Sequence, residues 1–533
     1  MKPQVYRIAV AVGVATIASS MTAQAQMRDR LEKISGIAVG DGIQKNIGGQ
    51  IGTGRGSVNT PDSSIFIIQR DPFRSVRRGR QLFQRKFLPT QGFSGRDRAG
   101  NIAVDASIGA GVVDSCAGCH GRPRGSAGFG GDVFTRPDSR DAPHLFGLGL
   151  QEMLADEMTT DLRAIRAGLA VGQTGTLVSK GVNFGTIRRT GTTTFDTSGV
   201  VGVNPDLRVR PFFAQGGTIS IREFLVGAFN AEMGIQSDDA DLRNAAINRQ
   251  RVVTPAGMVL DGALDAIEAP PVTGSNGVDP DGDGIPNELP ISLVDHEEFY
   301  LLNYFKPGTS IPPDKAAEVN TGRTLFTSAG CASCHIATLT INVDRRVADL
   351  ETVFSDFNPA SPTTSGNPLN RLFATATPKI ITIDDPGSFP VLKRPAGGTF
   401  VVNNFFADLK RHDLGNNFAE RNFDGTLLRQ TMTEPLWGVG TTAPYGHDGR
   451  SQSLEEVILR HGGEALTQRD NFNALSRANK NLVLTFLGSL VLFPPDDTAS
   501  STSNINPNAA NFPQAGHGAI ALTPLFNNPA DLE

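Results

Sequence analysis

The sequence predicts a mainly α-helical protein that contains two similar domains, with long loops and small β elements. An eight-residue pattern, V-x-x-G-R-x-L-F, occurs at residues 76–83 and again at 319–326, and its apolar positions fall on one face of a helix. A C-x-x-C-H motif follows each copy, at 116–120 and at 331–335. Glycine (59) and proline (33) are abundant among the 533 residues, which favours short helices with long connections.

The overall composition is that of a globular protein. Hydrophobic residues make up 39% of the chain and charged residues 19%, which argues against a disordered chain. The net charge is -5 and the pI about 6.0. We therefore expect no nucleic-acid partner and no basic membrane-binding face.

The first residues have the pattern of a cleaved signal peptide. Lys2 and Arg7 precede a short apolar stretch at 8–17, and Ala23-Gln24-Ala25 forms a small-x-small cleavage site. The alternative is an uncleaved anchor, but the apolar stretch is too short to span a bilayer. No later stretch reaches 18 apolar residues. We expect a periplasmic or secreted protein without a membrane span, cleaved after Ala25.

The cysteines predict covalently bound haem. Four cysteines in an exported protein would ordinarily suggest disulfides, but all four fall in the two C-x-x-C-H units, and none is left over. Attachment of haem c needs two thiols one helical turn apart and an adjacent histidine that binds iron. A zinc or redox-active C-x-x-C site would not need that histidine both times. The expected attachment and proximal residues are Cys116, Cys119, His120, Cys331, Cys334 and His335.

Each copy is therefore predicted to be a small cytochrome c-like domain that carries one haem c. The predicted segments are a signal peptide at 1–25, an N-terminal domain with insertions at 26–275, a C-terminal domain at 276–495, and a tail at 496–533.

Helices that close each domain are also predicted. In the second copy, residues 453–461 begin with a capping box and end at two glycines, and 475–490 is amphipathic. In the first copy, 145–167 is the expected counterpart. Residues 170–290 are rich in Thr and Gly in places, which indicates loops or small hairpins.

Several motifs together resemble a known family. They are Phe146-Gly147-Leu148-Gly149-Leu150, His412-Asp413-Leu414-Gly415, Glu434-Pro435-Leu436-Trp437-Gly438, Ala443-Pro444-Tyr445-Gly446-His447-Asp448-Gly449 and His461-Gly462-Gly463-Glu464-Ala465. The chain resembles bacterial di-haem cytochrome c peroxidases, and most closely the subgroup of di-haem oxidoreductases, over residues 70–165 and 275–490.

The resemblance implies an axial ligand for the C-terminal haem. The distal ligand in such peroxidases, usually Met, lies fourteen residues after the histidine that corresponds to His447, and here that position is His461. A bis-His haem with His335 and His461 should have a lower potential than a Met/His haem. The alternative is a helix C-cap cation at His461. His447 is implied to lie near this haem, at a propionate, or else to be a surface turn residue.

The N-terminal haem, on His120, is the predicted active site. His144 is the best candidate for its distal residue, with an ordinary histidine at a helix start as the alternative. Glu152 follows at i+8 on the same expected helix, and a distal carboxylate would move a proton during O–O cleavage. A solvated helix-face residue is the alternative for Glu152.

A calcium loop is predicted between the domains, where the resemblance also implies calcium. Its expected ligands are Asp279, Asp281, Asp283 and Asn287. Gly284 permits the tight turn, but position 12 is Pro290, so a further carboxylate would come from Glu288 or Glu297. The alternative is an acidic surface turn.

These observations predict a periplasmic di-haem c oxidoreductase of the peroxidase type. Hydrogen peroxide or a related oxidant would react at the N-terminal haem, with electron relay through the C-terminal haem. A small redox protein (a cytochrome or cupredoxin) or a small molecule would donate electrons.

Alternatives are a dioxygen-using oxygenase resembling rubber-cleaving enzymes, an enzyme similar to the one that matures tryptophan tryptophylquinone, and a non-enzymatic electron-transfer cytochrome. Trp437 is expected to be a packed core residue rather than a relay.

Overall fold

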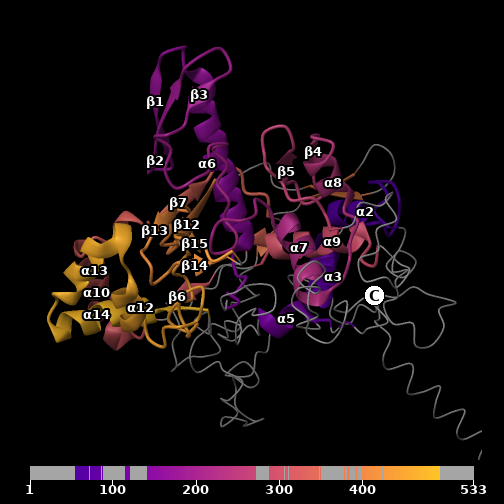
Figure 1. The fold of residues 1–533 in the computed structure, drawn as a ribbon. Helices are drawn as coiled ribbons and strands as arrows, with labels where there is room; N and C mark the ends of the chain where they lie inside the picture. Colours follow the sequence, from indigo (N-terminus) through magenta and orange to yellow (C-terminus); the bar gives the residue numbers. More distant parts are fainter. Residues whose placement is uncertain are drawn as a thin grey trace, which may run out of the picture.

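The fold is that of a helix-rich chain with small antiparallel sheets (Figure 1), which agrees with the predicted mainly α class. The structure is a computed structural model, and it describes residues 54–70, 72–85, 87, 115–120, 141–271, 287–304, 307–309, 311–346, 348–349, 377–378, 381–384, 390–393, 399–422 and 424–492. The predicted signal peptide and tail lie outside these residues.

The helices are α2 (Ser64–Arg70), α3 (Pro72–Gln84), α5 (Cys116–Cys119), α6 (Leu148–Gly168), α7 (Ile221–Met233), α8 (Ala240–Ala246), α9 (Ile291–Leu302), α10 (Ala316–Ser328), α12 (Leu454–Arg460), α13 (Leu466–Asn473) and α14 (Arg477–Gly488), with short 3-10 turns η3 (Pro313–Lys315), η4 (Cys331–Ser333) and η5 (Gly463–Ala465).

The strands are β1 (Thr174–Ser179), β2 (Val182–Arg189), β3 (Phe195–Asp196), β4 (Arg251–Val253), β5 (Val259–Asp261), β6 (Gly308–Thr309), β7 (Thr338–Ile341), β8 (Ala348–Asp349), β9 (Thr377–Pro378), β10 (Ile381–Asp384), β11 (Pro390–Lys393), β12 (Phe400–Asn403), β13 (Arg411–Asp413), β14 (Glu420–Arg421), β15 (Leu427–Leu428), β16 (Gln430–Met432) and β17 (Leu490–Val491). β1, β2 and β3 form one sheet, and the other described strands pair two by two.

The repeated sequence pattern forms two equivalent helix pairs. α3 packs on α9, and α10 packs on α14, and Figure 1 shows the two pairs on opposite sides of the molecule. The shared glycine lies at each crossing. A Cβ on Gly79 would lie 2.3 Å from the carbonyl oxygen of His296, and one on Gly322 would lie 2.0 Å from that of Leu482. The glycine of the pattern is therefore required for close helix packing.

α9 completes the first copy. Its Phe299 and Tyr300 share a buried core with Val76 and Phe83 of α3. The predicted boundary between residues 275 and 276 puts α9 with the C-terminal domain, whereas its packing is with α3. The helix expected at 145–167 is present as α6, but α9 occupies the position equivalent to α14.

α6 joins the two copies. Its buried Met153 and Leu154 share a core with Leu339 of β7 and Val402 of β12. Further along, Glu157 accepts hydrogen bonds from the backbone N–H of Asn342 at 2.8 Å. The helix then runs outward to the β1–β2–β3 sheet (Figure 1), which confirms a hairpin in this part of the chain.

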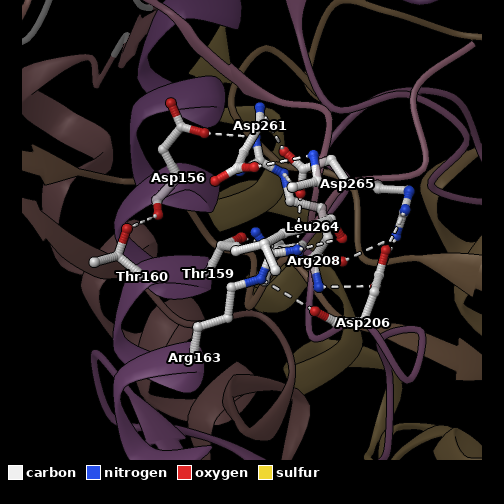
Figure 2. A network of polar contacts seen from close by, with 12 residues as sticks. Asp156, Thr159, Thr160, Arg163, Asp206, Arg208, Asp261, Leu264 and Asp265 are labelled. Carbon is white, nitrogen blue, oxygen red and sulfur yellow. Dashed lines mark hydrogen bonds and ion pairs between the residues drawn. The ribbon is translucent and has the colours of Figure 1, made fainter. Parts of the chain in front are cut away.

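The outer part of α6 is fixed by the polar network in Figure 2. The Arg163 guanidinium lies 2.8 Å from the Asp265 carboxylate, and Arg208 lies 2.6 Å from Asp156. The hydroxyl of Thr159 accepts a hydrogen bond from the backbone N–H of Val209. These contacts attach two loops of the region between the haem motifs to α6.

Candidate functional site

The two C-x-x-C-H motifs adopt the same local geometry. The backbone N–H of His120 bonds to the carbonyl of Cys116 at 2.9 Å, and that of His335 bonds to Cys331 at 3.0 Å. Each motif is one helical turn, and none of the four cysteines is in a disulfide. Because the two cysteines of a motif are three residues apart, the turn brings them onto one face.

Each motif histidine is oriented by a backbone carbonyl. Nδ1 of His120 donates to the carbonyl of Pro143 at 2.8 Å, and Nδ1 of His335 donates to that of Phe406 at 2.9 Å. Because a carbonyl only accepts, Nδ1 carries the proton and Nε2 keeps its lone pair. Burial lowers the pKa of both histidines, to about 4 for His335. Neutral imidazoles held in this way are suited to bind iron through Nε2.

These donor sets fit the covalent attachment and axial ligation of haem c. Two thiols on one turn and a neutral imidazole with an available Nε2 are what such a group requires. Within the described part of the chain, Nε2 of His120 and Nε2 of His335 accept no hydrogen bond.

His461 lies within electrostatic range of His335, because its charge is one of the effects that lower the pKa of His335, after burial. His461 is the C-cap of α12, and its Nδ1 donates to the carbonyl of Val457 at 2.8 Å. That bond satisfies a carbonyl at the helix end and leaves Nε2 available. Burial lowers the pKa of His461, which disfavours the cation that the C-cap alternative requires.

His144 lies before α6 rather than within it. The helix begins at Leu148 after Gly147, whose φ of 76° is left-handed. The expected i, i+8 relation between His144 and Glu152 on one helix is therefore wrong. Nε2 of His144 donates to the carbonyl of Trp437 at 3.1 Å, and Nδ1 accepts from Phe146 N–H at 3.3 Å. Burial lowers the pKa of His144 to about 4.

The position of Pro143 bears on the distal role expected for His144. The Pro143 carbonyl contacts Nδ1 of His120, so Nε2 is the ring nitrogen that would bind iron. His144 follows directly in the chain, and so begins on the Nδ1 side of His120. This geometry does not favour a distal position for His144.

Glu152 is buried and ion-paired. Its carboxylate lies 2.6 Å from Arg345 and accepts from the N–H of Ile221, the first residue of α7, at 2.7 Å. Burial raises the pKa of Glu152 to about 7, although Arg345 opposes this. Glu152 is 1% exposed, which contradicts the solvated helix-face alternative. No contact joins Glu152 to His120 or His144 within the described residues.

His447 contacts residues 141 and 418. Its carbonyl accepts a hydrogen bond from the N–H of Asp141 at 2.8 Å. The Phe418 ring lies 6.4 Å from the His447 ring and 5.0 Å from the His461 ring. His447 is thus near the predicted C-terminal haem ligand, separated from it by one aromatic ring.

Most of the predicted calcium loop, including Asp279, Asp281 and Asp283, lies outside the described residues. Asn287 is exposed, and its side-chain oxygen accepts from the N–H of Asp238 at 3.0 Å. The buried Glu288 accepts from the N–H of Gln236 at 2.9 Å.

Glu297 occupies a different place from the one expected for a calcium ligand. Its carboxyl is buried and lies 3.5 Å from the Cys116 sulfur. Burial raises the pKa of Glu297 to about 8. Its position on α9 places it at the N-terminal haem motif.

Trp437 is a core residue, as expected, and it also connects the two motifs. It is 2% exposed, and its ring packs edge-on against Phe405 with 5.0 Å between ring centroids. Phe406, the next residue, supplies the carbonyl that holds His335. The Trp437 carbonyl holds His144. A continuous series of bonds and contacts thus runs from one motif histidine to the other.

Two residues that hold the motif histidines could not be found from the sequence, because the Pro143 and Phe406 carbonyls belong to the backbone and have no side-chain signature. His412 belongs to the motif His412-Asp413-Leu414-Gly415, to which the sequence assigns no role. In the structure, Nε2 of His412 lies 2.9 Å from Asp408 and Nδ1 lies 2.8 Å from Glu464.

A polar recess of about 710 Å³ opens beside α12. Its lining includes Asn416, Asn417, Arg450 and Arg460. Arg460 directly precedes His461, so the recess lies next to the C-terminal site.

Fold and site together define a helical protein with two carbonyl-oriented C-x-x-C-H histidines. Residues 374–490 match the family described as "Di-haem oxidoreductase, putative peroxidase". The match confirms the predicted resemblance for this part of the chain, and it supports a haem-dependent oxidoreductase. No curated protein matches the chain.

Two solved structures align over most of the chain. The hydrazine synthase of Kuenenia stuttgartiensis is 13% identical, covers 86% of this chain and 98% of its own, and has a TM-score of 0.29. A MauG-like protein associated with microbial copper homeostasis is 14% identical, covers 84% of this chain and 95% of its own, and has a TM-score of 0.25. Scores this low do not establish a shared fold. Among the helices of the described residues, none has the length and apolar character needed to cross a bilayer.

Proposed function

We propose that the chain is an exported di-haem c oxidoreductase that reduces hydrogen peroxide or a related oxidant at the haem on His120. His335 and His461 would together hold the second haem, which would relay electrons. The observation that carries the proposal is that His120 and His335 differ in the second imidazole that lies near them. His335 has an imidazole with an available Nε2 within electrostatic range, whereas His144, the candidate beside His120, has both ring nitrogens hydrogen-bonded.

The residues of the chain have distinct tasks in this function. Pro143 and Phe406 orient His120 and His335 through their carbonyls, so that each imidazole stays neutral. The bound haem supplies iron that exchanges electrons and, at the N-terminal site, an open position for the oxidant. Reduction of peroxide to water consumes electrons and protons in equal number. Glu152, with a pKa near 7, can hold or release a proton in this region of the molecule.

The inter-haem route that we propose follows the contacts of Trp437. Electrons would pass from the His335 side through Phe406, Phe405 and Trp437. They would then reach the N-terminal site through the His144 hydrogen bond and the adjacent Pro143. His144 thereby acts on the proximal side of His120.

Electrons would enter at the C-terminal haem, from a small cytochrome, a cupredoxin or a small-molecule donor. The polar recess beside His461 leaves this part of the surface accessible. The signal-peptide pattern places the protein in the periplasm or outside the cell, where such donors occur.

We further propose calcium in the loop that contains Asp279, Asp281, Asp283 and Asn287. Its support is the spacing of the oxygen ligands and the anchorage of Asn287 and Glu288 to residues 236–238. Metal analysis after dialysis without chelator should give about one calcium per chain. A protein without calcium would contradict this part of the proposal.

The function is tested by haem staining and spectroscopy of the purified protein. The mature chain should carry two covalent haems on a denaturing gel, and one of them, high-spin, should react with peroxide and bind carbon monoxide. Two unreactive low-spin haems would instead identify an electron-transfer cytochrome. Stable oxy-haem bands in the isolated protein would identify an oxygenase. A chain with no haem, or only one, would contradict the proposal.

A further inference from the structure

His412 lies at the centre of a buried polar cluster beside the C-terminal motif. It belongs to β13 and is 7% exposed. Its two ring nitrogens contact two carboxylates, Asp408 at 2.9 Å and Glu464 at 2.8 Å. The Cys334 sulfur, an Asp408 oxygen and a His412 nitrogen lie within 4.8 Å of one another.

These contacts determine the charge of His412. A carboxylate has no proton to give, so each ring nitrogen must donate and the ring is an imidazolium. Burial lowers the pKa of His412, but the hydrogen bond with Asp408 and further favourable contacts outweigh burial and raise it to about 10. Because neither nitrogen has a lone pair left, the cluster does not bind a metal ion through His412.

Each carboxylate belongs to a segment that holds one of the two axial histidines. Asp408 follows Phe406 by two residues, and the Phe406 carbonyl orients His335. Glu464 follows His461 by three residues. His412 therefore connects the support of the proximal ligand to the loop that carries the distal ligand.

The backbone around the cluster is closely packed. Glu464 also accepts from the N–H of Asp413 at 3.0 Å. Gly463 has a positive φ of 52°, and a Cβ there would lie 2.1 Å from the Asp413 carbonyl. The loop after His461 thus lies directly against the strand that carries His412.

We propose that His412 is a positioning residue that holds His335 and His461 in register at the C-terminal haem. It joins three segments through two charge-assisted hydrogen bonds and the contact with Cys334. Such bonds are stronger than neutral ones and fix the geometry of both partners. The inference rests on the proposed bis-His ligation.

The experiment measures carbon monoxide binding to the fully reduced holoprotein. In the wild type, one haem should bind rapidly, and the second should bind slowly because His461 must first dissociate. In His412→Ala, the second phase should be about tenfold faster, as expected for loss of a charge-assisted hydrogen bond. The low-spin resonance of the oxidised C-terminal haem should broaden or shift as well. A purely structural role for His412 would lower the melting temperature and leave the second phase and the resonance unchanged.

A second variant and a control keep the test decisive. Glu464→Gln weakens only the link to the His461 loop, and its side chain is half exposed, so folding should be preserved. Glu464→Gln should also accelerate the slow phase of carbon monoxide binding. If His412→Ala does not fold, this variant alone tests the role of His412. Glu318→Gln removes an exposed carboxylate of α10 that pairs with Lys315, its one ion-pair partner among the described residues, and should behave as wild type.

The outcomes separate the two proposals. Rapid binding at both haems in the wild type would overturn the bis-His assignment itself. A slow second phase in the wild type, with the same rate and the same low-spin resonance in His412→Ala and Glu464→Gln, would overturn the role of His412 alone.

Discussion

Nε2 of His144 donates a hydrogen bond to the carbonyl oxygen of Trp437 at 3.1 Å, across 293 residues of sequence. His144 directly follows Pro143, whose carbonyl orients His120. The ring of Trp437 packs on Phe405, which directly precedes the residue whose carbonyl orients His335. The two C-x-x-C-H motifs are therefore connected by a series of packed side chains and backbone contacts.

Replacement of Trp437 tests this coupling. Trp437→Phe keeps the backbone carbonyl that holds His144 but removes the indole. We expect electron exchange between the haems to slow about tenfold, which corresponds to about 1.4 kcal/mol of activation free energy. Flash photolysis of the half-reduced carbon monoxide complex measures this rate. An unchanged rate, with both haem spectra intact, would show that electrons do not use the indole.

Replacement of His461 tests the ligation of the C-terminal haem. His461→Ala removes the imidazole whose Nε2 is available near His335. One low-spin haem should become high-spin, and this change is visible in the electronic absorption and paramagnetic resonance spectra. If the low-spin signal persists, another residue is the ligand.

The glycines of the repeated pattern are expected to be sensitive to a single methyl group. Gly322→Ala would place a Cβ 2.0 Å from the Leu482 carbonyl and force α10 away from α14. We expect a loss of about 1–3 kcal/mol in the free energy of unfolding, as for other overpacked sites. Gly79→Ala should behave in the same way in the first copy.

The matched control is a helical glycine with open space around it. No heavy atom lies within 4 Å of a Cβ placed on Gly227 of α7. Gly227→Ala should therefore stabilise the protein by about 0.5–1 kcal/mol through helix propensity. Denaturant unfolding distinguishes the two kinds of site, and equal effects at Gly322 and Gly227 would contradict the packing argument.

The pH dependence of stability should report on Glu297. Burial raises its pKa in the folded state from 4.5 to about 8, so folding favours the protonated carboxyl. This contribution is fully present below pH 4.5 and is lost as the pH rises through about 8, at about 1.4 kcal/mol per pH unit between these values.

Glu297→Gln removes this ionisation. Its melting temperature should fall less between pH 5 and 8 than that of the wild type, and it should be the more stable protein at about pH 8. Asp470→Asn, at an exposed site, serves as the control. Parallel pH profiles for wild type and Glu297→Gln would exclude Glu297 as a buried titrating group.

Local patterns in the sequence predicted local structure well. The N-cap at Ser453 is present, since its hydroxyl accepts from Glu456 N–H at the start of α12. The Glu456 carboxylate accepts from the N–H of Gln452 instead of that of Ser453, so the reciprocal bond of the predicted capping box is shifted by one residue. The repeated pattern forms α3 and α10, and the 475–490 prediction corresponds to α14. α7, α8 and α13 were not anticipated. α9 was not predicted either, because residues 295–298 are four consecutive polar residues that are nevertheless buried, so the sequence shows no apolar face there.

The sequence by itself determined the chemistry that each motif can perform, because two thiols and a histidine in five residues are brought together by one helical turn. It also indicated the helix pairs, through a repeat whose glycine lies at the close crossing of each pair. Only the tertiary structure decided which carbonyl orients each histidine, which side of His120 faces Pro143, and that His412 contacts carboxylates from the segments that follow Phe406 and His461. Those relations depend on contacts between residues tens to hundreds of positions apart, and backbone carbonyls leave no trace in the identity of the residues that carry them.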